Sequence, residues 1–179
     1  MSRADQEHWD TRYKAEAVGD IGPPALFAPV AAELANCGSA IELACGTGET
    51  SLWLASQGVD VAGYDISPVA ITIAQSSADE HDLQCRCRFE VTDFDDGLPD
   101  GPAVDLVLCH MFRDASLDDQ LRRRLAPNGL LAIACLSEVG AGPGRFRAAR
   151  GELRSAFSDL ALIIEGERDG VAWLVARYG

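Results

Sequence analysis

No stretch of this sequence is apolar for long enough to cross a membrane. A spanning helix needs about 20 consecutive apolar residues, and every apolar run here is shorter. The first ten residues, MSRADQEHWD, are charged and lack the apolar core of a secretory signal. We therefore expect no membrane partner and a cytoplasmic location.

Basic residues are also scarce. Lys and Arg number 15 against 28 Asp and Glu, which leaves a net charge of −13. Such a charge repels phosphate backbones and anionic lipid surfaces, so nucleic acid is not expected as a partner. The one basic run, RRR at 122–124, is typical of a solvated helix face.

The cysteines follow no zinc-ligand spacing. The sequence has six, and several lie in apolar, strand-like runs, as buried free thiols do in a reducing compartment. The nearest pair, CRC at 85–87, does not have the usual zinc spacing, and no second Cys or His pair lies close to it. We expect no metal site.

What the sequence does contain is a regular alternation of short apolar segments with helical ones. Strands are predicted over 39–45, 59–65, 84–94, 103–112, 130–137, 160–168 and 170–178. Helices are predicted over 2–17, 21–38, 48–58, 67–81, 116–129 and 148–160. The last two strands are joined by Asp-Gly, a hairpin signal. Alternation of this kind favours an α/β fold with a mostly parallel sheet, and the length suits one domain.

Three local signals refine these predictions. Ser67 followed by Pro68 predicts a capped helix start, and Ser116 is expected to cap the later helix in the same way. Pro29 lies inside the predicted helix over 21–38, so the start of that helix is expected to be irregular.

The most informative stretch is AIELACGTGETSLWLA at 40–55. Its two glycines, Gly46 and Gly48, follow a strand and precede a helix, so the backbone there can approach a ligand closely. The pair allows three interpretations: a dinucleotide site, a site for another nucleotide-like cofactor, or a tight turn without a ligand. A dinucleotide motif would place a third small glycine-like residue at position 51, where Ser51 stands.

Polar side chains also follow the next three strands, at the edge of the sheet where ligands bind in such folds. Asp65 ends the second strand, and its two carboxylate oxygens suit the vicinal hydroxyls of a ribose. Asp93 and Phe94 follow the third strand and suit an adenine, or form a turn and a core contact. His110 ends the fourth strand, where it either accepts a proton or only packs.

Together these motifs resemble the class I S-adenosylmethionine-dependent methyltransferases over nearly the whole chain. ELACGTGE is similar to their first motif, VAGYDISPVAITIA to their second and VTDF to their adenine-contacting turn. AVDLVLCHMF and RLAPNGLLAIACLS resemble the fourth strand and the helix, turn and strand that follow it. The start HWDTRYK and the segment GELRSAFSDLALIIEGERDGVAWLVARY at 151–178 are similar to small members of the tellurite-resistance and thiopurine type.

The resemblance implies a Rossmann-like, doubly wound α/β sheet of seven strands, in the order 3-2-1-4-5-7-6, with the last strand antiparallel and helices on both faces. It implies a single methyltransferase domain over 1–179, made of a helical cap over 1–37 and a core over 38–179. One departure is visible. The family usually has glycine where Ala44 stands, and only a slight tightening of the loop is expected from alanine.

The resemblance also implies the cofactor, S-adenosylmethionine, with S-adenosylhomocysteine as product. The cofactor-binding residues that it carries over are Trp9, Arg12, Tyr13, Glu42, Ala44, Cys45, Gly46, Gly48, Asp65, Ile66, Asp93, Phe94 and Cys109. Asp65 would hold the ribose, and Asp93 with Phe94 the adenine. His110 is the first candidate for a general base.

The expected acceptor is a small molecule, because no inserted domain or nucleic-acid module is visible in the sequence. The loop over 137–151 carries Arg145, Arg147 and Arg150, which form either a cationic lid over an anionic acceptor or a solvated loop. Two other functions stay open: an NAD-linked oxidoreductase, and a protein that binds a cofactor without catalysis. The chain is expected to act as a monomer or homodimer.

Overall fold

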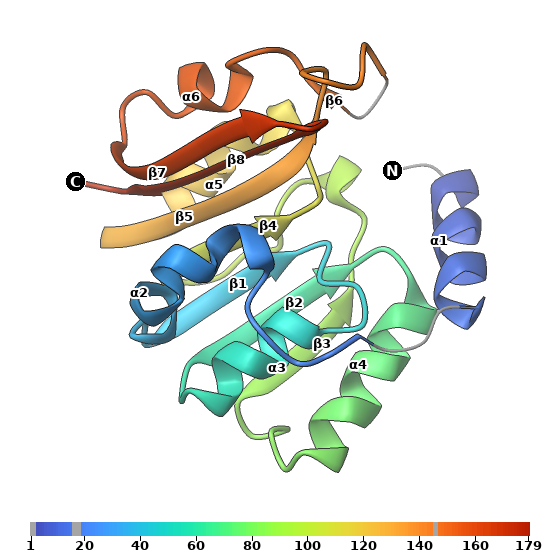
Figure 1. Ribbon diagram of the computed structural model, residues 1–179. Coiled ribbons are helices and arrows are strands. Elements are labelled where there is room, and N and C mark those ends of the chain that lie inside the picture. Colours follow the sequence, from blue (N-terminus) through green and yellow to red (C-terminus); the bar gives the residue numbers. More distant parts are fainter. Residues whose placement is uncertain (1–2, 16–18, 145–146) are drawn as a thin grey trace.

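The computed structural model describes residues 3–15, 19–144 and 147–179, and its centre is a single mixed sheet (Figure 1). The main strands run in the order β3-β2-β1-β4-β5-β8-β7. Their bounds are β1 Ser39–Leu43, β2 Asp60–Asp65, β3 Cys87–Val91, β4 Val104–His110, β5 Leu125–Ser137, β7 Ala161–Arg168 and β8 Val171–Arg177. Strand β8 is antiparallel to both neighbours, and the other pairs are parallel. The predicted α/β fold and strand order are thereby confirmed.

One short strand was not predicted. β6 (Arg147–Ala148) pairs in parallel with Leu136 and Ser137 at the end of β5, and its presence shifts the numbering of the last two strands by one. β4 pairs with β5 only as far as Ala134, so β6 lies in line with β4, beyond its carboxyl end. One part of the loop predicted over 137–151, the strand β6, therefore lies at the edge of the sheet where β4 ends (Figure 1).

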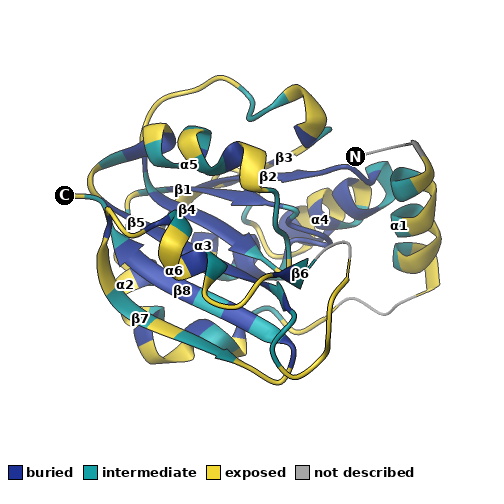
Figure 2. Cartoon of the chain, turned by 90° about the horizontal axis from the view of Figure 1, so that it is seen from above, coloured by how far each residue is buried: buried dark blue, intermediate teal, exposed yellow. Residues whose placement is uncertain are grey.

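Helices cover both faces of the sheet, and each face has its own apolar core. One core contains side chains from η1 (Ala25–Val30), α2 (Ala31–Ala35), α3 (Glu49–Ser56) and α4 (Pro68–Glu80). The other contains side chains from η2 (Phe94–Asp96), η3 (Ala115–Leu117), α5 (Asp118–Arg124) and α6 (Glu152–Ala156). The strands between them are largely buried, while the helices expose their outer sides (Figure 2). Burial on both faces explains why the central strands are continuous apolar runs.

The N-terminal helix α1 (Arg3–Ala15) lies apart from these layers. It packs beside α4, at the side of the sheet where β1, β2 and β4 end (Figure 1). Its sequence is polar on most sides, and its half-buried residues lie along one face: Asp5, Gln6, Trp9, Asp10 and Tyr13. The predicted helix over 2–17 thus extends over Arg3–Ala15 within the described residues.

Several local predictions are confirmed. Ser67 caps α4 by accepting a hydrogen bond from the Ala70 amide, with Pro68 as the first helical residue. Pro29 lies inside the 3-10 turn η1, which replaces the start of the predicted helix over 21–38. Asp169 and Gly170 form the tight turn between β7 and β8, both with positive φ, as a two-residue hairpin loop requires.

The helices α5 and α6 are much shorter than predicted, and one predicted cap is wrong. Ser116 does not cap a helix; Asp114 accepts from the Ser116 amide and starts η3 instead, so the cap lies two residues earlier. Pro127 then restricts the residue before it to extended backbone, which ends α5 early and begins β5 at Leu125. Gly151, with a φ of +70°, likewise delays the predicted helix over 148–160, which forms only as α6.

The connection between β3 and β4 has no α-helix. A crossover between parallel strands usually contains one, but residues 92–103 form only the three-residue turn η2. The sheet face that carries Ile41, Ala62 and Arg88 is therefore open at the amino ends of β1, β2 and β3. Within the described residues, no helix has both the length and the apolar character needed to span a bilayer.

Candidate functional site

The glycine pair forms the loop between β1 and α3, and both glycines have left-handed backbone. Gly46 has a φ of +55° and Gly48 a φ of +87°. A Cβ on Gly48 would lie 2.9 Å from the Cβ of Ala74 and 3.0 Å from the Phe89 ring, so close packing against α4 and β3 also requires glycine there. The loop is thus a tight turn whose amides lie at the carboxyl edge of the sheet.

Ala44 also has a positive φ, of +52°. For a residue with a Cβ this conformation costs about 1 kcal/mol, which is the physical reason for a glycine at this position. The sequence predicts a slight tightening of the loop. The structure shows instead that Ala44 adopts the left-handed backbone typical of glycine, so its conformation is strained.

Asp65 connects the loop to the second strand. Its carboxylate accepts hydrogen bonds from the Gly46 and Ser67 amides, both at 2.9 Å, and its side chain is buried. Burial raises its pKa, and the amide of Ser67 is the strongest of the contacts that oppose the rise. Ile66 is buried between the two polar residues. The predicted contact of Asp65 with a ribose stays a prediction.

Glu42 lies buried beneath the same loop, on β1. It accepts a hydrogen bond from the Ser51 hydroxyl on α3, at 2.5 Å. Burial raises the pKa of Glu42 to about 8, against the hydrogen bonds from Ser51 and Thr50. From the sequence alone, Ser51 is only a mismatch to a dinucleotide motif. The sequence feature that could have predicted the Glu42–Ser51 pair is a single acid within an apolar strand, followed by a polar residue on the next helix.

Helix α1 brings its aromatic residues over the loop. Trp9 and Tyr13 stack at 5.8 Å between ring centroids, and the Arg12 guanidinium lies over Trp9 at 5.1 Å. The Tyr13 hydroxyl would be 3.0 Å from a Cβ on Gly46, so its ring covers that glycine. Burial, and then the nearby charge of Asp65, raises the pKa of Tyr13.

Asp10 also holds α1 in place, and sequence reasoning missed it. Its carboxylate accepts a hydrogen bond from the hydroxyl of Ser67, the residue that caps α4. The spacing of Trp9 and Tyr13 predicts that this face of the helix packs against the protein. Asp10 is one of several acidic residues in a polar helix, so the sequence does not distinguish it. Asp10, Ser67 and Asp65 therefore link α1 to the glycine loop.

Asp93 and Phe94 lie beyond the end of β3. Asp93 caps the turn η2 by accepting from the Asp95 amide. Phe94 is 2% exposed and packs on Phe112 with 5.3 Å between ring centroids, so it belongs to the apolar core. The adenine contact predicted for this pair stays a prediction.

The end of β4 brings Cys109 and His110 to the same edge of the sheet. Cys109 is buried between β1 and β5, and burial raises its pKa. His110 faces the opposite side, edge-on to Phe27 with 6.2 Å between ring centroids. Burial lowers the pKa of His110, so the ring is neutral at pH 7 and able to accept a proton. Met111 follows with a φ of +61° and an exposed side chain.

The loop over 137–151 has less free positive charge than its sequence suggests. Arg147 donates from Nη1 to the carbonyls of Ser137 and Gly170, at 2.7 and 3.2 Å, and so joins the loop to the β7–β8 turn. Arg150 is exposed, and Arg145 lies outside the described residues. Arg113, which sequence reasoning missed, is buried near the end of β4 in ion pairs with Asp118 and Glu152.

Within the described ranges, no cluster of three or more His, Cys, Asp or Glu side chains is arranged to hold a metal ion. The polar groups at this edge instead comprise backbone amides, one neutral histidine and buried carboxyls. Such a set suits hydrogen bonding to an organic ligand that carries hydroxyl and amine groups.

Comparison with known proteins bears on this site. The sequence model of the family described as "Methyltransferase domain" matches residues 40–129, which include the glycine loop, Asp65 and His110. An uncharacterized RNA methyltransferase of Parasynechococcus marenigrum (strain WH8102) is 44% identical over 62 residues, which are 35% of this chain. The chain spans only 13% of that protein's length.

Solved structures resemble the whole chain. TehB from Haemophilus influenzae has a TM-score of 0.76 at 18% identity, covering 97% of this chain and 67% of its own. Magnesium protoporphyrin IX methyltransferase from Synechocystis PCC 6803, solved with bound SAM, has a TM-score of 0.72 at 18% identity, covering 98% and 96%. At these identities the likeness concerns the fold alone.

The strain at Ala44 generates a first prediction. Ala44→Gly should raise the free energy of unfolding by about 1 kcal/mol, because glycine adopts a positive φ without a Cβ clash. Urea unfolding would measure the change. Ala40→Gly, in the regular part of β1, is the matched control and should lower stability. A loss of stability in both variants would contradict the assignment of strain.

The burial of Glu42 generates a second prediction. Its pKa is raised in the folded protein to about 8, so the stability that it contributes is present at low pH and is lost as pH rises toward that value. Glu42→Gln cannot ionise. Relative to the wild type, its free energy of unfolding should therefore increase with pH, by at most about 1.4 kcal/mol per unit.

Urea titrations of both proteins at about pH 6 and pH 8 would test this second prediction. Glu33→Gln, which changes an exposed glutamate on α2, is the control and should show no such trend. Parallel pH curves for Glu42→Gln and the wild type would contradict the prediction.

Proposed function

Because the chain belongs to the family described as "Methyltransferase domain", we propose that it is an S-adenosylmethionine-dependent methyltransferase that methylates a small-molecule acceptor by in-line displacement. The resemblance seen in the sequence motifs is thereby confirmed at the level of the family. The observation that carries the proposal is the joining of the glycine loop to Asp65 at the carboxyl edge of the sheet. Ligands of doubly wound sheets bind at this edge.

The residues at this edge fit the proposed cofactor. Two left-handed glycines allow close approach of the backbone, and the buried Asp65 presents carboxylate oxygens beside them. The cofactor site is proposed to comprise Trp9, Arg12, Tyr13, Glu42, Ala44, Cys45, Gly46, Gly48, Asp65, Ile66, Asp93, Phe94 and Cys109. Because the Tyr13 ring contacts Gly46, we expect that ring to turn aside when the cofactor binds.

When bound, S-adenosylmethionine would supply an activated methyl group on a sulfonium. The protein then has to align the acceptor, limit water and, for a protonated nucleophile, accept a proton. His110 suits that last role, because its ring is neutral and lies at the end of β4. The loop amides and Asp65 orient the cofactor, while α1 covers the site from solvent.

Several features favour a small-molecule acceptor over RNA. The net charge of −13 opposes binding to a phosphate backbone. The relative described as an RNA methyltransferase is 44% identical to this chain over 62 residues, which are 13% of that protein's length, so its description says little about the acceptor of this chain. We also propose cytoplasmic action as a monomer or homodimer. The NAD-linked and non-catalytic alternatives are disfavoured by the family match.

A third prediction concerns the cofactor. Asp65→Ala should weaken S-adenosylhomocysteine binding by about 1–3 kcal/mol, because it removes a buried carboxylate that also holds the Gly46 amide. Titration calorimetry would measure the affinity, with a thermal melt to show that the variant is folded. Asp60→Ala, at the exposed start of the same strand, is the control and should bind normally.

Two outcomes of this titration would contradict the proposed site. Unchanged affinity for S-adenosylhomocysteine in a folded Asp65→Ala variant would show that Asp65 does not bind the ribose. Binding of NAD by the wild type, without binding of S-adenosylhomocysteine, would overturn the proposed cofactor.

A fourth prediction separates the acceptor classes. His110→Ala should lower turnover of a hydroxyl or amine acceptor by about a hundredfold or more, since a base no longer takes the proton. Turnover of a thiol that is already ionised should change little. For the wild type, the rate with a hydroxyl acceptor should rise with pH through the lowered pKa of His110. An equal loss with both acceptor classes would assign His110 a structural role.

A further inference from the structure

A groove lies on the open face of the sheet, at the ends of the strands opposite the glycine loop. It has a volume of about 300 Å³ and lies over the amino-terminal parts of β1, β2 and β3, where the crossover to β4 provides no helix. Its apolar lining includes Ile41, Ala62, Pro102 and Val104. The glycine loop, Asp65 and His110 do not line it, so the groove is separate from the proposed methyl-transfer site.

Arg124 lies at one side of this groove and is unusual for a cation. It is the last residue of α5, yet only 8% of it is exposed. Its Nη1 donates to the carbonyl of Pro99 at 2.8 Å, while its buried Nε has no hydrogen-bond partner among the described residues. A Cβ on Gly101 would collide with Nη2, so the absence of a side chain there makes room for the guanidinium.

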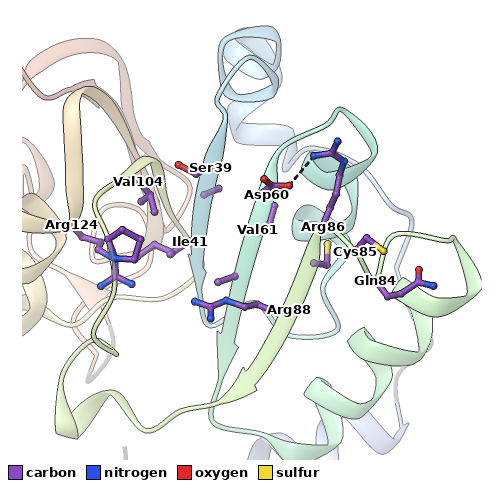
Figure 3. Close-up of a pocket in the computed structure, with 14 residues that line it drawn as sticks. Ser39, Ile41, Asp60, Val61, Gln84, Cys85, Arg86, Arg88, Val104 and Arg124 are labelled. Atoms are coloured by element: carbon purple, nitrogen blue, oxygen red, sulfur yellow. Dashed lines mark hydrogen bonds and ion pairs between the residues drawn. The ribbon is translucent and has the colours of Figure 1, made fainter.

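Arg88 lies at the opposite side, on β3. Figure 3 shows Arg88 and Arg124 reaching over the sheet from the two sides of the groove, with Ile41 between them. Among the described residues, Arg88 donates to the Tyr64 hydroxyl at 3.1 Å and forms an exposed ion pair with Glu90 at 3.4 Å. Its charge is therefore available to a ligand.

The remaining charges of the groove are already paired. Arg86 contacts Asp60 at 2.8 Å, and the same Arg86 nitrogen donates to the carbonyl of Gly58. The groove thus keeps an excess of positive charge in a chain whose net charge is −13. A buried donor without a partner is costly, and an anionic acceptor would relieve that cost.

We propose that this groove binds a small organic carboxylate with an apolar body. The carboxylate would accept from Arg124 and Arg88, whose planar guanidinium groups match its geometry. The apolar body would cover Ile41, Ala62 and Val104. A volume of about 300 Å³ is at the lower end of the range for small-molecule sites, which suits a ligand of one ring.

Benzoate and benzamide form a matched pair of probes, because they differ chiefly in charge. Amide NMR spectra of the full chain, saturated with S-adenosylhomocysteine, should show a saturable response to benzoate at Ile41, Ala62, Arg88 and Arg124. Benzamide should bind at least about tenfold more weakly, since it cannot form the charged hydrogen bonds. Equal binding of the two probes, or no saturable response to benzoate, would overturn the proposal.

Substitutions test the two arginines separately. Arg124→Gln should weaken benzoate binding by at least about tenfold, whereas Arg123→Gln, at the exposed neighbouring position of α5, should not. Arg88→Gln removes the exposed cation on the opposite side of the groove and should also weaken benzoate binding. This variant tests the proposal even if Arg124→Gln does not fold. Thermal melts identify unfolded variants. Benzoate affinity unchanged by Arg88→Gln, or lowered as strongly by Arg123→Gln, would contradict the site.

Discussion

The hydrogen bonds that Asp65 accepts from the amides of Gly46 and Ser67 are the contacts on which the candidate site depends. They join the end of β2, the loop after β1 and the start of α4. Ser67 extends the connection, because its amide donates to Asp65 while its hydroxyl caps α4 and contacts Asp10 on α1. One buried carboxylate therefore sets the position of three elements around the same edge of the sheet.

Burial at this edge has chemical consequences. Glu42 and His110 are both shifted toward their neutral forms, because desolvation penalises charge. Ala44 and Met111 keep left-handed backbone in spite of their side chains, and such strain is commonly found near functional sites. Neutral polar groups and a strained but well-packed backbone suit a site that orients an organic cofactor.

The two ends of the sheet differ for a topological reason. At the carboxyl ends, the loops after β1, β2 and β4 converge and are covered by α1 and by the connection through β6. At the amino ends, the crossover over 92–103 contains only a 3-10 turn, so one face is left open. The buried cation Arg124 lies beside that open face, which explains why a groove with positive charge exists in an acidic protein.

The sequence by itself determined the succession of strands and helices, the hairpin at Asp169 and the edge of the sheet at which Asp65 and His110 lie, because apolar periodicity, glycine and capping residues act locally. The order of the strands in the sheet was implied only by the family resemblance. The predicted starts of the helices near Ser116 and Gly151 are wrong. Asp114 caps an earlier 3-10 turn, and Gly151 has left-handed backbone, so α6 begins after it. Only the tertiary structure decided that Ser51 pairs with Glu42, that Asp10 reaches Ser67 and that the Nε of Arg124 has no partner among the described residues. Those contacts join residues on different elements, and no local pattern encodes which side chains the packed layers bring together.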